Sequence, residues 1–375
     1  MLTAFVNELL KKTVREVRPF LGVEQRFFDA LPFISKPSIE SPIDHRTKSS
    51  TRRSNSSERN RPRTSARRGG SSGDGRANTP GPRAASAEEK QFLAGTAINP
   101  DSRIILEKGS DDLSVRALDL ICPIGMGQRA LVVASPGLGK TTFLKNICNS
   151  VTKGYPEMKV YCVLVDERPE EVTDFKRSVE AEVYSSSMDE SQGNHIKVVD
   201  VVMAKAFKDA AGGKDVMILL DSLTRLARVH NSTHRSGGRT LSGGVGAGAM
   251  EIPRRIFGAA RNIEGSGSIT IIATVLVDTG SAMDTVIFEE FKGTGNMELV
   301  LSKNLAKARV FPAIDVLKSA TRRTDLLFEP EEHQQLELLY RNLATTDQGA
   351  PIERLLSLLK KYPTNSELLA SFKAR

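Results

Sequence analysis

Apolar and polar positions alternate most regularly between residues 129 and 328. An apolar run at Ala130–Val133 leads through a Gly/Pro turn into a helix predicted at Thr141–Ser150. Further apolar runs have the length and composition of buried strands and are separated by helical segments. This alternation is typical of a parallel sheet covered by helices on both faces, so we predict an α/β fold. The further strands are expected at Val160–Val165, Ile196–Val202, Val216–Leu220 and Ile269–Leu276.

Two shorter patterns flank this region. Before it, residues 89–128 hold strand-like pieces at Arg103–Glu107 and Leu113–Leu118, which we interpret as a connector. After it, residues 329–375 carry leucine stripes at helical spacing, which predict two or three C-terminal helices.

The N-terminus divides into two unlike segments. In residues 1–34 an apolar helical face from residues 2 to 18 predicts an amphipathic segment that ends near Pro19. We favour packing on its own chain or a neighbour over a membrane surface, because the segment carries Asn7 and Glu8 and no Trp. Residues 35–88 are rich in Arg, Ser and Gly and almost free of large apolar residues, so we expect a disordered linker.

The net charge of +8 belongs to this linker. Residues 46–83 hold eleven Lys and Arg, opposed only by Glu58 and Asp74, and the rest of the chain is close to neutral. Arginine neutralises nucleic-acid phosphates without reading sequence, so one interpretation is a tether for RNA or DNA. The other interpretation is a solvated linker.

Cysteines and membrane signals indicate a cytoplasmic protein. Cys122, Cys148 and Cys162 lie in apolar runs without metal or disulfide spacing and are interpreted as reduced core residues. No apolar run reaches the length of a membrane span, and the N-terminus lacks a secretory cleavage site. We therefore expect no membrane partner.

A phosphate loop follows the strand at Ala130–Val133. The sequence Ala134-x4-Gly139-Lys140-Thr141 places exposed backbone N–H groups and a helix N-terminus where phosphate oxygens can bind. Lys140 would reach the terminal phosphates and the Thr141 hydroxyl would hold Mg²⁺. The alternative is a glycine-rich turn that binds nothing. The predicted nucleotide-binding residues are Ser135, Pro136, Gly137, Leu138, Gly139, Lys140, Thr141 and Thr142.

Two acidic residues end strands next to this loop. Asp221 closes an apolar run and would order a water on the Mg²⁺ held by Thr141. Glu167 would polarise a water for attack on the γ-phosphorus. Asp166 and Glu167 could instead cap the helix that begins near Pro169.

Several separate motifs resemble one family, the transcription termination factor Rho. The resemblance runs from about residue 92 to the C-terminus. It is carried by Leu118-Asp-Leu-Ile-Cys-Pro-Ile-Gly125, Asp166-Glu-Arg-Pro-Glu-Glu-Val-Thr173, Asp221-Ser-Leu-Thr-Arg-Leu-Ala-Arg228, Phe257-Gly-Ala-Ala-Arg-Asn262, Phe291-Lys-Gly-Thr-Gly-Asn-Met-Glu-Leu299 and Arg309-Val-Phe-Pro-Ala-Ile-Asp315.

The resemblance implies a homohexameric ring of RecA-like ATPase domains that uses ATP and Mg²⁺. Such a ring moves 5′→3′ on single-stranded RNA and releases transcripts from RNA polymerase. It implies roles for Glu167 as the catalytic base, for Asp221 on the Mg²⁺ side and for Phe311 in stacking on adenine. Arg322 resembles an arginine finger that reaches the neighbouring subunit's ATP, and Arg168 resembles a residue that couples subunits.

The resemblance also implies two RNA-binding pore loops, and it places the ATPase domain at residues 129–328. Read without the family, these segments are ordinary glycine-rich surface loops. The loop residues are Arg239, Leu241, Ser242, Gly243, Gly244 and Val245 in the first loop, and Lys292, Gly293, Thr294 and Gly295 in the second.

The chain departs from the family at three places. Before residue 88 it shows no OB-fold pattern and no Tyr or Trp. Gly137 stands where the family usually has Lys, and Gly246 and Gly248 stand where it has larger polar residues. We therefore weigh an RNA motor with non-standard loading against a catalytically weak ring that regulates termination by binding RNA, polymerase or partner subunits. A rotary or protein-export ATPase fits the quoted motifs poorly.

Overall fold

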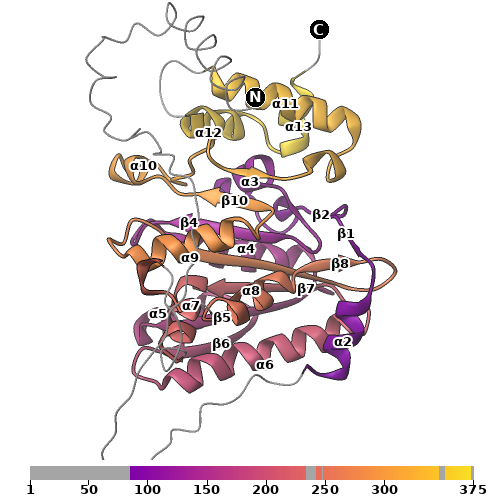
Figure 1. The fold of residues 1–375 in the computed structure, drawn as a ribbon. Coiled ribbons are helices and arrows are strands. Elements are labelled where there is room, and N and C mark those ends of the chain that lie inside the picture. Colours follow the sequence, from indigo (N-terminus) through magenta and orange to yellow (C-terminus); the bar gives the residue numbers. More distant parts are fainter. Residues whose placement is uncertain (1–84, 234–241, 247, 346–350, 373–375) are drawn as a thin grey trace, which may run out of the picture. The chain divides into compact units, whose positions relative to one another are not determined.

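A mainly parallel sheet forms the centre of the computed structural model, which describes residues 85–233, 242–246, 248–345 and 351–372 (Figure 1). The strand order is β11-β10-β4-β9-β7-β5-β6, and β8 joins the sheet by pairing with β9 and β1. The five central strands from β10 to β5, with β6 beside them, run parallel, whereas β8 and β11 pair antiparallel with their neighbours. Their bounds are β4 Arg129–Ala134, β5 Lys159–Glu167, β6 Glu182–Ser187, β7 Val216–Asp221, β8 Arg261–Ile263, β9 Ser268–Leu276, β10 Met297–Val300 and β11 Ala320–Thr321.

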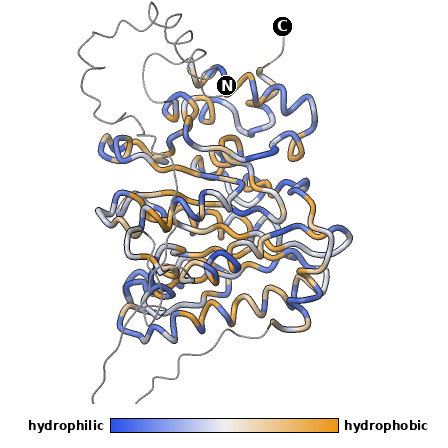
Figure 2. Tube along the Cα trace, viewed as in Figure 1, coloured by the Kyte–Doolittle hydropathy of each residue, from blue (hydrophilic) through white to orange (hydrophobic). Residues whose placement is uncertain are grey.

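Helices cover both faces of this sheet and bury two separate cores. Along β4, Ala130 and Val132 face the core that α4 shares with the C-terminal helices, whereas Leu131 and Val133 face the core of α6 to α9. Apolar residues therefore dominate the interior strands on both faces, as Figure 2 shows. The helices are α2 Ala87–Ala94, α3 Leu113–Ile121, α4 Lys140–Gly154, α5 Pro169–Ser178, α6 Gln192–Ala211, α7 Leu223–Thr233, α8 Glu251–Gly258, α9 Ala282–Lys292 and α10 Lys303–Lys307.

Short elements complete the described chain. Strand β1 (Ala97–Ile98) pairs with β8, and β2 (Arg103–Ile104) pairs with β3 (Ile124–Gly125) in a separate ribbon. Three single-turn helices are η2 Leu106–Lys108, η3 Ser242–Gly244 and η4 Thr324–Leu326. Three C-terminal helices follow, as the leucine stripes predict: α11 Pro330–Ala344, α12 Pro351–Lys361 and α13 Asn365–Ala370.

Three strand predictions are corrected. The run Ile196–Val202 lies inside α6, because the buried residues from His195 to Ala210 recur at three- and four-residue spacing beyond the apolar run. Ser191 begins this helix by accepting a hydrogen bond from the Asn194 N–H. The run Leu113–Leu118 is the start of α3, and of Arg103–Glu107 only the first two residues form a strand. The amphipathic segment 1–34 and most of the predicted linker lie outside the described residues.

Candidate nucleotide site

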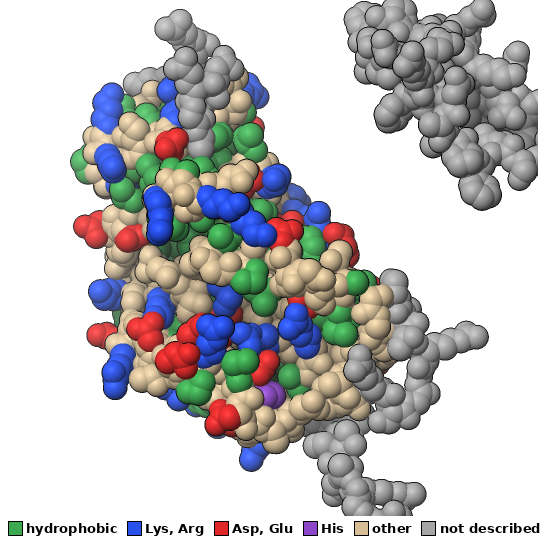
Figure 3. Space-filling model, turned by 90° about the vertical axis from the view of Figure 1, so that its left-hand side faces the viewer, with side chains coloured by type: hydrophobic (Ala, Val, Ile, Leu, Met, Phe, Trp, Pro, Cys, Tyr) green, Lys and Arg blue, Asp and Glu red, His purple; other side chains and the backbone are tan. Residues whose placement is uncertain are grey.

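The phosphate loop connects the end of β4 to the start of α4. The backbone at Gly137 and Gly139 is left-handed, with φ of +81° and +85°, a conformation that side chains disfavour. A Cβ built at either glycine would meet no atom within 4 Å, so the loop is open in front of its backbone. In Figure 3, which faces the carboxyl ends of the parallel strands, acidic and basic side chains gather on this face. The loop thus has the backbone shape and the open space that a polyphosphate requires.

Lys140, Thr141 and Asp221 meet at the base of this loop. The Lys140 Nζ donates to both carboxylate oxygens of Asp221, at 2.6 and 2.7 Å, and the Thr141 hydroxyl donates to Asp221 Oδ2 at 3.0 Å. Thr274 on β9 donates to Asp221 Oδ1 at 2.8 Å and fixes this buried carboxylate. The structure therefore brings together the lysine, hydroxyl and acid that the sequence placed at the phosphates.

Glu167 lies beside this cluster at the end of β5. Its Oε1 accepts from Arg225 Nη2 at 3.2 Å, and its Oε2 lies 3.8 Å from Lys140 Nζ with no hydrogen-bond partner in the described structure. Burial raises the pKa of Glu167, whereas the charges of Arg225 and Lys140 oppose that rise. A buried carboxylate with one unpartnered oxygen facing the phosphate-binding lysine can accept a proton there.

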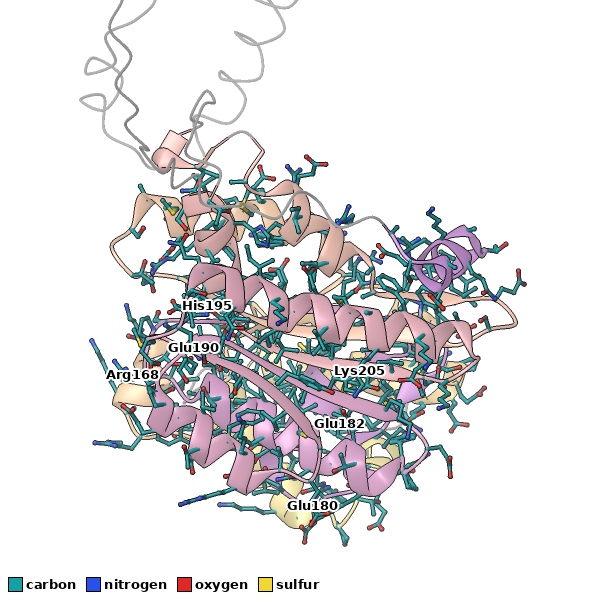
Figure 4. The ribbon with its side chains drawn as sticks, turned by 90° about the horizontal axis from the view of Figure 1, so that it is seen from below. Arg168, Glu180, Glu182, Glu190, His195 and Lys205 are labelled. Atoms are coloured by element: carbon teal, nitrogen blue, oxygen red, sulfur yellow. The ribbon has the colours of Figure 1, made fainter. Side chains whose placement is uncertain are left out.

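The helix-capping alternative for Asp166 and Glu167 does not describe α5. Arg168 occupies the N-cap position, and no side chain caps this helix. Within α5 and its N-cap, Glu167 accepts from the Arg168 N–H, at 3.1 Å, while its other contacts are to Arg225 and Lys140. The exposed Arg168 side chain pairs with Glu171, and Arg168 lies at the border of the molecule in Figure 4.

The oxygen donors at this site suit a divalent cation that is carried by phosphates. Mg²⁺ usually takes one or two protein oxygens, with phosphate and water completing its shell. Thr141 and Asp221 offer a hydroxyl and a carboxylate next to each other. Within the described ranges no group of three or more His, Cys, Asp or Glu residues could hold a metal by itself.

Three residues near the site went unassigned from the sequence. Arg225 follows Asp221 by one helical turn, and that spacing after a strand-end acid is the signal that could have identified it. Asp278 follows β9, accepts from the Ser135 hydroxyl at 2.9 Å and lies 3.4 Å from Lys303. No sequence pattern marks the contact between Ser135 and Asp278, because the two residues are far apart in the chain.

Phe311 and Arg322 lie outside the hydrogen-bonded cluster of Lys140, Thr141 and Asp221. Phe311 is 56% exposed just after α10, so its ring is available for stacking. Arg322 follows β11, and its N–H donates to the Asn296 carbonyl oxygen just before β10. Since β10 runs parallel to β4, Arg322 lies at the amino ends of the strands and the phosphate loop lies at their carboxyl ends.

Of the first predicted RNA loop only a part is described, and its Gly243 lies at the opposite end of α9 from the second predicted loop. Arg239 and Leu241 lie outside the described residues, and Ser242 is described only through its backbone in η3. Asn231 on α7 donates to the Gly244 carbonyl oxygen, and a Cβ on Gly243 would press on Ala282 at the start of α9. Val245 is buried in the core of α6 to α9.

The second predicted loop begins at Lys292, the last residue of α9, and continues to Gly295. Eleven residues of helix separate it from Ala282, a distance of roughly 16 Å. Gly243 therefore lies next to the first turns of α9, at Ala282 and Val286, and Lys292–Gly295 lies toward the opposite edge of the sheet, next to Arg129.

Comparisons with known proteins agree with this site. Residues 114–321 match the nucleotide-binding domain of the ATP synthase alpha/beta family. The transcription termination factors Rho of Haemophilus influenzae and Bacillus subtilis are both 50% identical to the chain, over 281 and 283 residues. These alignments cover 74% and 75% of this chain and 67% and 66% of the relatives. A type III secretion ATPase shares the fold, with a TM-score of 0.62 and 24% identity over 78% of this chain and 90% of that one.

The fold and the phosphate loop define a RecA-like P-loop ATPase that binds and hydrolyses ATP. Within that class, the chain belongs to the transcription termination factor Rho family. It spans about two thirds of the length of the two relatives named above. None of the described helices is long and apolar enough to cross a membrane.

Proposed function

We propose that the chain is an RNA-stimulated ATPase that assembles into a homohexameric ring, moves 5′→3′ on single-stranded RNA and terminates transcription. The observation that carries this proposal is the placement of Lys140 and Arg322 at opposite ends of the parallel strands. The six residues of β4 span roughly 20 Å, so Arg322 is out of reach of the phosphates in its own chain. A neighbouring copy would supply its Arg322 if the amino ends of its parallel strands (its amino edge) faced this site.

The active site of this ring would be shared between subunits. Glu167 would take a proton from the water that attacks the γ-phosphorus, and Lys140 would neutralise charge on the terminal phosphates. Thr141 and Asp221 would hold Mg²⁺, which supplies Lewis-acid stabilisation when bound. An arginine supplied in trans accelerates hydrolysis by about 10³–10⁵-fold in related phosphoryl-transfer enzymes.

RNA would be captured by the basic linker and gripped in the pore. The eleven basic residues at positions 46–83 favour phosphate contacts without base readout. The segment around Gly243 lies beside the start of α9 and offers backbone groups that suit a sliding grip. RNA would also be contacted at the end of α9, by Lys292, Gly293, Thr294 and Gly295.

The test is ATP hydrolysis by the whole purified chain with and without single-stranded RNA. We expect RNA to stimulate turnover, Lys140→Ala to abolish it, and deletion of residues 36–88 to raise the RNA concentration needed for half-stimulation. The matched control replaces residues 36–88 with a Gly/Ser linker of equal length. If that control keeps wild-type RNA affinity and salt dependence, the linker does not bind RNA.

The second candidate is a catalytically weak ring that regulates termination by binding RNA, polymerase or partner subunits. The observation that favours it is Gly137, which leaves the tip of the phosphate loop without a side chain. RNA-stimulated turnover by the chain alone would exclude this candidate. An assembled ring that binds ATP and RNA without turnover would establish it.

A further inference from the structure

Three arginines gather at the amino edge of the sheet. Arg129 begins β4 and Arg261 begins β8, and both strands pair with β9, where their partners Ile271 and Ile269 are two residues apart. Arg322 joins them through Asn296, whose backbone carbonyl accepts from the Arg322 N–H and whose side chain accepts from the Arg129 N–H at 2.8 Å. Neither β4 nor β8 nor β11 places an acid beside them.

The hydrogen bonds of the Arg129 and Arg261 guanidinium groups go to carbonyl oxygens and not to carboxylates, although Glu89 and Asp200 line the same pocket as Arg261. The Arg129 guanidinium donates to the carbonyl oxygens of Thr294 and Ala260, both at 3.0 Å, and Arg261 Nη2 donates to the Gly258 carbonyl oxygen. The Arg261 Nε is buried without a hydrogen-bond partner in the described structure. None of the carboxylates in the described ranges forms an ion pair with any of the three arginines.

Such an arrangement costs free energy until an anion enters. Like charges at short range repel, and a buried guanidinium nitrogen that has given up its hydration has no compensating bond. Burial and the charges of Arg261 and Arg322 lower the pKa of Arg129, in agreement with this crowding. A tetrahedral anion with several oxygens satisfies such a cluster, because guanidinium groups form parallel hydrogen bonds to phosphate.

We propose that Arg261 contacts, together with Arg322, the terminal phosphate of the nucleoside triphosphate bound by a second copy of this chain, and that Arg129 is the positioning residue of this anion site. This inference rests on the shared active site proposed above. It adds two arginines to the one that motif resemblance indicates. Arg129 acts by holding the Thr294 and Ala260 backbones, which flank the two contacting arginines.

Subunit mixing tests this assignment with the whole chain. We expect Arg261→Gln to lower kcat for ATP by about 10- to 100-fold, the contribution of one hydrogen bond to a charged group. A Lys140→Ala chain is inactive but offers an intact amino edge. Mixing the two impaired chains should therefore restore turnover well above the sum of both, because an interface that joins the ATP site of an Arg261→Gln chain to the amino edge of a Lys140→Ala chain is complete.

The control is Arg255→Gln, which removes an exposed arginine on α8 six residues before Arg261. It should keep wild-type kcat. Arg261→Lys keeps the charge and should retain more turnover than Arg261→Gln, with KM for ATP unchanged. If Arg261→Gln does not assemble, the kcat of Arg261→Lys relative to the wild type tests the inference.

Each contrary result has a distinct meaning. If Arg261→Gln matches Arg255→Gln while the wild type hydrolyses ATP, this inference fails and the proposed function stands. Assembled mixtures without recovery, or equal activity of the Lys and Gln variants, would show that Arg261 acts only within its own fold. Weaker binding of a fluorescent single-stranded RNA, with unchanged ATP turnover at saturating RNA, would assign the anion to RNA. A wild-type ring without any ATP turnover overturns the proposed function itself.

Discussion

Arg225 holds only one of the two carboxylate oxygens of Glu167. Its Nη2 donates to Oε1 at 3.2 Å, and Oε2 is left facing Lys140. The same guanidinium also donates to Asp166 on the same strand, so Arg225 fixes the end of β5. The orientation of the proposed base therefore depends on a residue of α7.

Removing this ion pair should change the pH dependence of hydrolysis. Glu167 must be ionised to accept a proton, so kcat should fall when the pH drops below its pKa. Because this pKa is raised, the fall (the acid limb of the pH–rate profile) should occur at a higher pH than for an ordinary carboxyl group. In Arg225→Gln the opposing charge is gone, so the limb should move to still higher pH. A pH–rate profile measures this shift.

The matched control is Arg228→Gln, one turn further along α7. Arg228 pairs with Asp284 and makes no contact with Glu167. Its acid limb should coincide with that of the wild type. Glu167→Gln should lose about 10²–10⁴-fold in kcat and keep its affinity for ATP. Equal acid limbs in the two arginine variants would remove Arg225 from this role.

Arg116 should be among the most costly residues to replace outside the site. Its buried guanidinium lies 2.8 Å from Glu107 and donates to the carbonyl oxygens of Leu359 and Tyr362. Arg116→Met leaves Glu107 unpaired and should lower the free energy of unfolding by about 3–5 kcal/mol. Urea unfolding measures it. Arg354→Met on α12, which removes one exposed hydrogen bond, should cost less than about 0.5 kcal/mol. Equal costs would mean that Arg116 does not anchor the C-terminal helices.

Asp119 should make the protein less stable as the pH rises. Burial raises the pKa of Asp119 to about 7, although its oxygens accept from the N–H groups of Leu106 and Glu107. The folded protein thus binds a proton that the unfolded chain releases near pH 4, so this contribution is complete below about pH 4 and is lost through pH 7. Its size is on the order of 4 kcal/mol.

Urea unfolding between pH 5 and pH 8 measures this effect. The free energy of unfolding should fall more steeply with pH in the wild type than in Asp119→Asn, which has no group to titrate there. Asp111→Asn, at an exposed position nearby, should keep the wild-type slope. Parallel curves for the wild type and Asp119→Asn would contradict a carboxyl group that titrates near neutrality.

Two glycine substitutions should act in opposite directions. A Cβ on Gly109 would lie 1.9 Å from the Ser150 carbonyl oxygen, so Gly109→Ala must displace the backbone between η2 and α4. A Cβ on Gly193 in α6 would meet only Ser191, at 4.0 Å. Gly193→Ala should raise the free energy of unfolding by roughly 0.5–1 kcal/mol, whereas Gly109→Ala should lower it by more than that. Thermal melting of both variants checks the signs.

The sequence placed Lys140, Thr141 and Asp221 at the phosphate loop, and the fold supplied the residues that support them. Lys140, Thr141 and Asp221 were predictable because a strand, a glycine turn and a strand-end acid impose their meeting. Arg225 and Asp278 were not, since their roles depend on side chains that tertiary packing brings near. The error at Ile196–Val202 has a physical cause as well. Its β-branched residues favour a strand locally, but burial along one face of twenty residues determined a helix.

The last strand of the sheet, β6, has an open side that could pair with another chain. Glu182 on this strand and Lys205 on α6 lie together there, as Figure 4 shows, and the Lys205 Nζ is 2.6 Å from the Glu182 carboxylate. Charged side chains at a short edge strand oppose pairing with a strand from another chain, and so oppose amyloid-like aggregation. This pair therefore opposes the side-by-side joining of two copies of the chain through β6 into a continuous sheet.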